Sequence, residues 1–320
     1  MSQLAAGRKL VKEGRGSSRF TRWKRYAPLF MMVLPGALYL LFNNYVPMLG
    51  LIIAFKDINY TKGILASDWI GFKNFEFLFR TSDAYTITRN TILYNGAFIV
   101  INTAVAIGVA IMLNGLKNRI ASRFYQSVIL LPFLISTVVV GYLVFALLSM
   151  DSGLMNRTIL PALGLDPVMW YNNPKYWPYI LTIVHTWKEA GYLCVIYLAA
   201  ILGIDKEYYE AAKIDGANGR QQIMHITLPS ILPVIIIMTL LAIGKIFYAD
   251  FGLFYQVPLN SGILSPTTDV IDTYVYRALL NLGDIGMASA AGFYQSVVGF
   301  ILVIVSNLIV RKLNPDNALY

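Results

Sequence analysis

Four ionisable side chains lie inside stretches of sequence that are otherwise apolar. Lys188 and Glu189 are adjacent in one such stretch, and Lys245 and Asp250 lie in another. Charges in apolar surroundings are costly and usually face a cavity, a water-filled path or a partner of opposite sign. Two interpretations are therefore open. One is pairing, of Lys245 with Glu189 for example, or with charges on a partner subunit; the other is a cationic path for an anionic solute.

The residues that an enzyme mechanism needs are not arranged to support one. The sequence contains no G-x-x-x-x-G-K-[S/T] phosphate-binding motif and no H-E-x-x-H zinc motif. Its two histidines, His185 and His225, are far apart, and a serine or cysteine nucleophile would need a histidine nearby. The single cysteine, Cys194, excludes an internal disulfide. We therefore expect no catalytic residues, no cofactor and no metal site on this chain.

The composition is that of a protein with many membrane-spanning segments. Of the 320 residues, 57% are hydrophobic and only 13% are charged, whereas an ordinary soluble domain carries about 25% charged residues. A helix needs about 20 apolar residues to cross the hydrocarbon. Six runs meet this length, at 28–53, 90–113, 125–148, 176–202, 229–254 and 285–310. Because they lack strand-like alternation, they predict an all-α polytopic protein with six transmembrane helices.

The placement of lysine and arginine orients these helices. Residues 1–25, 116–124, 202–228 and 311–320 carry 16 of these cations, whereas 56–89, 150–175 and 256–284 carry 8. Since cytoplasmic segments are enriched in lysine and arginine, both termini are predicted to be cytoplasmic. We expect a basic cytoplasmic tail at 1–27, a membrane domain at 28–310 and a second tail at 311–320. The net charge of +9 is concentrated in the first tail, which argues against a nucleic-acid partner.

Two aromatic-rich segments lie in the predicted outer loops. Residues 69–79 mix aromatic and charged side chains, which predicts a short helix lying at the membrane interface. Aromatic residues between 170 and 179 lie where the fourth helix should enter the bilayer, as in an aromatic belt. We interpret both segments as membrane anchors in preference to stacking platforms for a ligand.

The cytoplasmic loop at 202–228 is longer and more patterned than a simple connection. Asp205 is placed to cap a helix that Gly216 then ends. Asn218, with Gln221 three residues later, is placed to cap a second short helix. Pro229 suits the first turn of the fifth membrane helix, where a missing N–H costs least. The loop therefore predicts two short helices with a glycine corner between them.

The first of these short helices offers a contact surface. The pair Ala211 and Ala212 leaves a shallow face, with the charges of Glu210 and Lys213 beside it. Such a face can enter a groove on another protein. The alternative is a pair of surface helices with no partner.

The same loop resembles the EAA loop of the membrane subunits of binding-protein-dependent ABC importers. The pattern of that family, E-A-A-x3-G-x9-I-x-L-P, is met at every defined position from residue 210 to residue 229. In that family the loop forms a coupling helix that sits in a cleft of the ATP-binding subunit. The resemblance therefore implies that the contact with an ATPase is made or shaped by Glu210, Ala211, Ala212, Asp215 and Gly216.

The resemblance spans residues 28–320 and is nearest to the maltose-permease type, especially the subgroup that handles complex oligosaccharides and alginate-like polysaccharides. Residues 45–50, 89–91, 292–299 and 314–320 carry this finer likeness. It implies the permease subunit of an ATP-driven sugar importer in a bacterial inner membrane, working by alternating access. The implied partners are a second permease subunit of the same family, an extracytoplasmic solute-binding protein and two ATP-binding subunits, which would hold the ATP and Mg.

The resemblance also gives the intramembrane charges a candidate role. An oligosaccharide with uronate groups would be attracted by Lys188 and Lys245, while Trp187, Phe247 and Tyr248 would stack on its rings. The alternatives are another cargo, such as an amino acid, a polyamine or a metal, or a secondary transporter. A secondary transporter would need paired intramembrane carboxylates and inverted repeats, and no such repeat is evident in the sequence.

Overall fold

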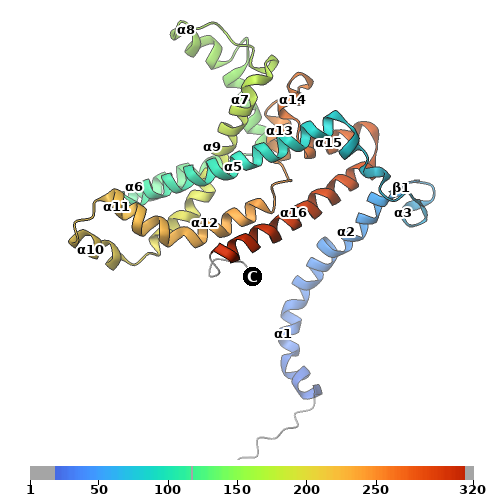
Figure 1. Ribbon diagram of the computed structural model, residues 1–320, viewed down its shortest axis with the longest axis horizontal. Helices are drawn as coiled ribbons and strands as arrows, with labels where there is room; N and C mark the ends of the chain where they lie inside the picture. Colours follow the sequence, from blue (N-terminus) through green and yellow to red (C-terminus); the bar gives the residue numbers. More distant parts are fainter. Residues whose placement is uncertain (1–18, 117, 314–320) are drawn as a thin grey trace, which may run out of the picture. The chain divides into compact units, whose positions relative to one another are not determined.

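The computed structural model describes residues 19–116 and 118–313. Most of the first predicted tail and most of the second lie outside these residues. The chain forms two units, residues 1–52 and residues 53–320, which are considered separately. The described residues are largely helical, as Figure 1 shows.

The first unit contains the first predicted span. It consists of α1 (Arg19–Leu40), the π-helical turn η1 (Leu41–Tyr45), α2 (Val46–Met48) and the beginning of η2 (Leu49–Phe55). The run Tyr26–Phe55 is long and apolar enough to cross a membrane. Pro47 lies two residues after the end of the π turn. It has no N–H to donate to the preceding turn, so the spacing of the backbone hydrogen bonds changes there.

The second unit contains the other predicted spans. They correspond to α5 (Ser82–Asn114), the pair α6 (Arg119–Leu134) and α7 (Thr137–Leu148), α9 (Trp177–Leu202), α12 (Leu228–Ile243) and α16 (Ile285–Leu313). Across the described residues, four helices are individually long and apolar enough to cross a membrane, and two bent helix pairs raise the number to six. The prediction of an all-α protein with six transmembrane helices is therefore confirmed.

The third predicted helix is not continuous. α6 and α7 meet at an angle of 96°, with extended backbone at Ile135 and Ser136. Pro132, in the last turn of α6, removes one hydrogen bond from that turn and weakens it. α7 then buries Val140 and Val144 in a core with Trp177 and α13 (Phe251–Gln256). The apolar run at 125–148 shows no boundary in the sequence. Because of the bend, its two halves, α6 and α7, pack in different directions.

The prediction for the fifth helix, at 229–254, is wrong at both ends. The helix begins at Gly219, as α11 (Gly219–Gln222), and passes through the π turn η7 (Ile223–Thr227) into α12. The second short helix predicted in the loop is thus the first turn of this span, and Pro229 lies inside it. α12 stops at Ile243, and residues 244–250 are not helical before α13 begins. Lys245 and Asp250 therefore do not lie on a membrane helix.

The outer segment at 69–79 is not the single interfacial helix predicted from its sequence. It contains β2 (Asp68–Trp69), paired antiparallel with β1 (Lys56–Asp57), then η3 (Lys73–Phe75) and α4 (Phe77–Arg80); α3 (Gly63–Ala66) lies between the strands. The Asn74 side chain donates to the backbone oxygens of Ala54 (3.1 Å) and Lys56 (3.0 Å). Phe55 and Phe75 pack against Phe293 of α16. These contacts favour a compact irregular fold over one helix.

The aromatic residues before α9 form core as well as surface. Trp177 is fully buried, donates to the Trp170 oxygen (2.9 Å) and packs edge-on against Tyr171. Tyr179, in contrast, is 70% exposed. The membrane-anchor interpretation therefore fails for Trp177. The short elements of this region are η4 (Met155–Ile159), α8 (Leu160–Ala162), η5 (Trp170–Asn172) and η6 (Pro174–Tyr176).

α5 and α9 form the centre of the second unit (Figure 1). One buried cluster, around Phe98, Trp177 and Leu253, joins them to α7 and α13. Another, around Ala110, Tyr197 and Ile231, joins them to α12. The remaining outer elements are η8 (Gly262–Leu264), α14 (Ser265–Thr268), α15 (Ile271–Arg277) and η9 (Ala278–Leu282).

We predict that Gly299→Ala destabilises the chain and that Gly292→Ala does not. Both glycines lie on α16, but a Cβ at Gly299 would be 2.8 Å from the backbone oxygen of Gly244, whereas a Cβ at Gly292 would meet nothing within 4 Å. Overpacking of this kind costs about 1–3 kcal/mol. Thermal unfolding in detergent should show a lower midpoint for Gly299→Ala alone. Equal midpoints for the two variants would contradict the close approach of α16 to the end of α12.

Candidate functional site

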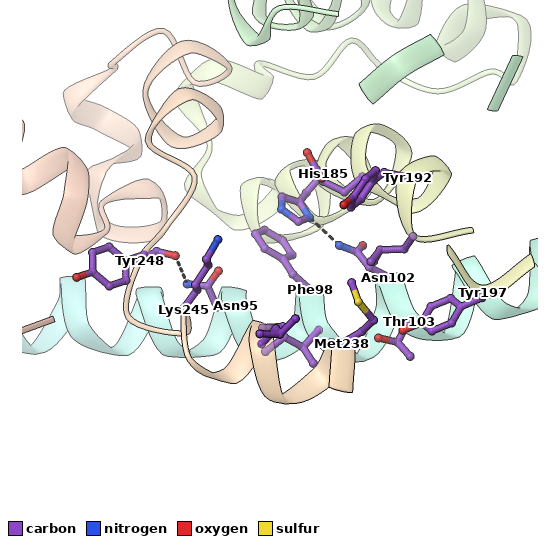
Figure 2. A pocket seen from close by; sticks show the side chains of 15 residues that line it. Asn95, Phe98, Asn102, Thr103, His185, Tyr192, Tyr197, Met238, Lys245 and Tyr248 are labelled. Carbon is purple, nitrogen blue, oxygen red and sulfur yellow. Dashed lines mark hydrogen bonds between the residues drawn. The ribbon is translucent and has the colours of Figure 1, made fainter. Parts of the chain in front are cut away.

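A cavity of about 480 Å³ lies between α5, α9 and α12, at the level where α12 ends. Figure 2 shows side chains from these helices and from the segment 244–250 around it. Its polar lining is formed by Asn95, Asn102, Thr103, His185, Glu189, Tyr192, Tyr197, Lys245 and Tyr248. The rest of the lining is apolar, which is the usual make-up of a site that binds a small molecule.

The lining follows two stripes at helical spacing. On α5 the stripe is Asn95, Phe98 and Asn102, at positions i, i+3 and i+7, and on α9 it is His185, Glu189 and Tyr192, at i, i+4 and i+7. Residues at these spacings share one face of a helix. The two stripes face each other across the cavity, so each helix turns its polar side toward the same space.

His185 is fixed in the cavity wall. Its ring stacks on Phe98 with centroids 3.8 Å apart, and its Nδ1 lies 3.0 Å from the amide nitrogen of Asn102. The stacking and this polar contact hold the imidazole ring against α5. The Oδ1 of Asn102 is buried and has no partner within the described residues.

The charges divide into a pair and a separate lysine. The ammonium of Lys188 lies 3.4 Å from the Glu189 carboxylate and 5.5 Å from the ring centroid of Phe133 on α6. Glu189 is therefore paired with its neighbour and not with Lys245. Lys245 lines the cavity and has no carboxylate at salt-bridge distance in the part of the chain that the structure describes. Since Lys188 offsets Glu189, the cavity keeps a net positive charge at Lys245.

The structure brings two of the five residues predicted for the translocation path to the cavity. Lys245 and Tyr248 line it, and the Tyr248 hydroxyl lies 2.7 Å from the Ser296 hydroxyl of α16. Phe247, between them, is buried against Tyr294. Lys188 and Trp187 do not line the cavity.

The predicted coupling loop forms a well-defined helix, α10 (Lys206–Ile214), with a cap at each end. At its start, the Asp205 carboxylate accepts from the Glu207 N–H at 3.0 Å. At its end, the Ala217 N–H donates to the Ala212 oxygen (2.8 Å) and the Gly216 N–H to the Lys213 oxygen (3.1 Å), with Gly216 at φ +81°. This is the Schellman arrangement, which needs a left-handed residue at that position. The glycine corner is confirmed.

The next helix begins as predicted at its cap. The Asn218 side chain accepts from the Gln221 N–H at 2.9 Å, and the Gln221 side chain accepts from the Asn218 N–H at 2.8 Å. This reciprocal capping box starts α11. The corner and the box together join α10 to α11, and α10 lies at an angle of 68° to α9.

α10 presents one face to the bundle and one to solvent. Tyr209 faces the bundle, where its hydroxyl lies 2.9 Å from the hydroxyl of Thr227, a buried residue of η7. On the other side, Glu210 and Ala211 are exposed, and Ile214 beside them is 87% exposed. Positions i and i+4, such as Glu210 and Ile214, are neighbours on a helix surface. Glu210 and Ile214 therefore lie side by side on the exposed face of α10.

Comparison with known proteins places the chain in a family. Residues 103–315 match the family described as "Binding-protein-dependent transport system inner membrane component". The chain belongs to this family. The match covers α10 and most of the helices that form the cavity.

Individual relatives resemble the chain over nearly its whole length. The "Polygalacturonan/rhamnogalacturonan transport system permease protein YteP" of Bacillus subtilis (strain 168) is 37% identical over 290 residues, which cover 90% of this chain and 89% of that protein. A crystal structure of a bacterial ABC transporter involved in the import of the acidic polysaccharide alginate contains a chain with a TM-score of 0.84 and 32% identity, covering 92% of this chain and 99% of that one. A second structure, of a bacterial alginate ABC transporter in complex with an alginate pentasaccharide-bound periplasmic protein, gives a TM-score of 0.83 and 32% identity, with 92% and 98% covered.

Several residues of the site were not predicted, although the sequence carries signals for them. In this inner membrane component, Asn95 and Asn102 are two amides seven residues apart in an apolar helix, and His185 and Glu189 are four apart in another. That periodicity marks a polar face. The exposure of Ile214 was not predicted either, because an isoleucine at the end of a short helix is usually packed against something.

We predict that Gly216→Ala loosens the end of α10 and that Gly219→Ala does not. Alanine at φ +81° is strained by about 1–2 kcal/mol, whereas Gly219 has room for a Cβ and no positive φ. Hydrogen exchange of the Gly216 and Ala217 amides in the purified chain should accelerate about tenfold, since 1.4 kcal/mol is a factor of ten. If Gly219→Ala has the same effect as Gly216→Ala, the left-handed corner is not what holds the loop.

Proposed function

We propose that this chain is the membrane-spanning permease subunit of an ATP-driven importer whose solute is an acidic oligosaccharide. The observation that carries the proposal is the cavity itself. It combines an uncompensated cation, Lys245, with hydrogen-bonding groups such as Asn102 and His185 and with the aromatic rings of Tyr192 and Tyr248. A lysine attracts uronate carboxylates, amide and imidazole groups bind sugar hydroxyls, and aromatic rings pack on the apolar faces of sugars.

The relatives support this choice of solute. One relative is named for polygalacturonan and rhamnogalacturonan transport. One of the similar structures is that of a transporter involved in the import of alginate. These polymers share sugars that carry carboxylates at neutral pH. A non-sugar cargo, such as an amino acid or a polyamine, has no comparable support from the cavity or from these relatives.

The proposed machine needs partners for energy and for solute delivery. This chain has no phosphate-binding motif, so ATP and Mg belong on two ATP-binding subunits. The exposed face of α10, with Glu210, Ala211 and Ile214, is the surface that enters the ATPase, while Asp215 and Gly216 shape its end. A second permease subunit completes the path, and an extracytoplasmic binding protein delivers the solute. ATP-driven movement of α10 then exposes the cavity to each side of the membrane in turn.

Ile214→Asp tests the coupling surface. When the chain is co-expressed with the ATPase, the second permease and the binding protein of its own system, this variant should lose most of the ATPase that co-purifies with the tagged wild-type chain. A carboxylate in place of a buried isoleucine costs several kcal/mol at an interface. The matched control is Ile263→Asp, at an isoleucine that is 57% exposed in the outer segment. If both variants retain the ATPase, or if the wild-type chain never retains one, the proposed assembly is wrong.

Lys245→Gln tests the solute. In vesicles reconstituted with the whole transporter, this variant should reduce uptake of uronate oligosaccharides relative to neutral ones of equal length by about tenfold, because a charged hydrogen bond is worth about 1.5–3 kcal/mol. The control is Lys175→Gln, at an exposed lysine before α9. An unchanged ratio in Lys245→Gln would rule out the acidic-solute assignment.

A further inference from the structure

The break after α12 is held by backbone turns of its own and by side chains from other helices. Residues 244–250 form no regular helix, so several of their backbone groups lack the usual partner four residues away. Non-helical backbone at membrane depth is tolerated only where it is buried in protein or lines a cavity, and its polar groups need partners. In this segment, four consecutive residues obtain those partners from outside the segment.

Asn95 of α5 secures two of these groups. Its amide donates to the Ile246 oxygen at 2.8 Å and to the Tyr248 oxygen at 3.2 Å. Figure 2 shows the Asn95 amide directed at the Tyr248 backbone, beside the Lys245 side chain. Asn95 also lines the cavity, so its removal would alter the cavity wall as well as the segment.

Gln295 of α16 and Asp272 of α15 secure the other two groups from outside the cavity. The Gln295 amide donates to the Phe247 oxygen at 2.7 Å and to an Asp272 carboxylate oxygen at 3.2 Å. The same carboxylate oxygen accepts from the Ala249 N–H at 2.8 Å. Neither side chain lines the cavity, and Gln295 is only 5% exposed. Burial raises the pKa of Asp272, and the hydrogen bonds that it accepts oppose this change.

We propose that Asp272 and Gln295 are positioning residues that fix the shape of the segment 244–250 and thereby hold Lys245 and Tyr248 at the cavity. They act on solute selection without touching the solute. The proposal rests on the proposed function for its transport consequence, but its structural part does not depend on the identity of the solute. Without these bonds, the backbone groups of residues 246–249 would lack those partners, so the conformation that carries Lys245 and Tyr248 to the cavity would not be fixed.

The structural test is hydrogen exchange over residues 244–250 in the complete transporter. Asp272→Leu and Gln295→Leu should raise exchange in this segment about tenfold or more and leave α5 and α9 unchanged. Asp272→Asn keeps an oxygen that accepts from the Ala249 N–H and should stay near the wild-type rate. Asp269→Leu is the control, because it removes a nearby carboxylate that pairs with Arg277 and not with the segment. Unchanged exchange in both leucine variants would overturn the proposal.

The functional test compares the same variants with Lys245→Gln in the uptake ratio of uronate to neutral oligosaccharides. The leucine variants should reduce that ratio toward the value of Lys245→Gln, and Asp272→Asn should restore it. A loss of total uptake with an unchanged ratio would show a merely structural role and overturn the positioning role. If Lys245→Gln itself leaves the ratio unchanged, the acidic-solute assignment fails, and the exchange result alone decides whether Asp272 and Gln295 fix the segment 244–250.

Discussion

The arrangement of the second unit depends on one constraint, which is that backbone polar groups in apolar surroundings must be hydrogen-bonded. Continuous helices meet it internally. The segment 244–250 meets it only in part through its own turns, and the remaining groups bond to Asn95, Asp272 and Gln295 from three different elements. An orphaned buried backbone group costs about 1–3 kcal/mol, so a break of this length is stable only when α5, α15 and α16 are all in place. The break therefore fixes the positions of these helices as much as they fix the break.

Side chains of α5 also supply hydrogen-bond partners to the backbone of residues 266–271. Asn90 donates to two backbone oxygens of the segment 266–269, and Tyr94 donates to a third at 2.7 Å. Thr91 accepts from the N–H of Ile271 at 3.0 Å. The first turns of α5 thus carry polar side chains that form hydrogen bonds with the irregular backbone of residues 266–271. The following turns carry the polar side chains that line the cavity. This explains why so apolar a helix carries asparagines at 90, 95 and 102.

The sequence indicates those parts of the fold that depend on local patterns. Apolar length predicts the spans, Asp205 and Asn218 predict the caps of the loop, and Gly216 predicts its corner. The breaks at residues 135–136 and 244–250 could not be predicted in this way. The apolar runs continue through both, and the contacts that favour the breaks come from other elements. The choice between Lys188 and Lys245 is of the same kind. Both are lysines in apolar runs, and only packing directs one to Glu189 and Phe133 and the other to the cavity.

In the proposed importer, a single helix connects the ATPase contact to the solute. The run Gly219–Ile243 contains 25 residues, or about 37 Å at 1.5 Å per residue. About a third of the way along it, the hydrogen bond between Tyr209 and Thr227 ties α10 to the π turn η7. At its far end, the chain passes directly into the segment that carries Lys245. A helix transmits displacement along its axis with little loss, whereas a clamped irregular segment has discrete arrangements. Movement of α10 would therefore reach the cavity as a change in the position of Lys245, so that the group which attracts the solute is also the group that ATP-driven motion displaces.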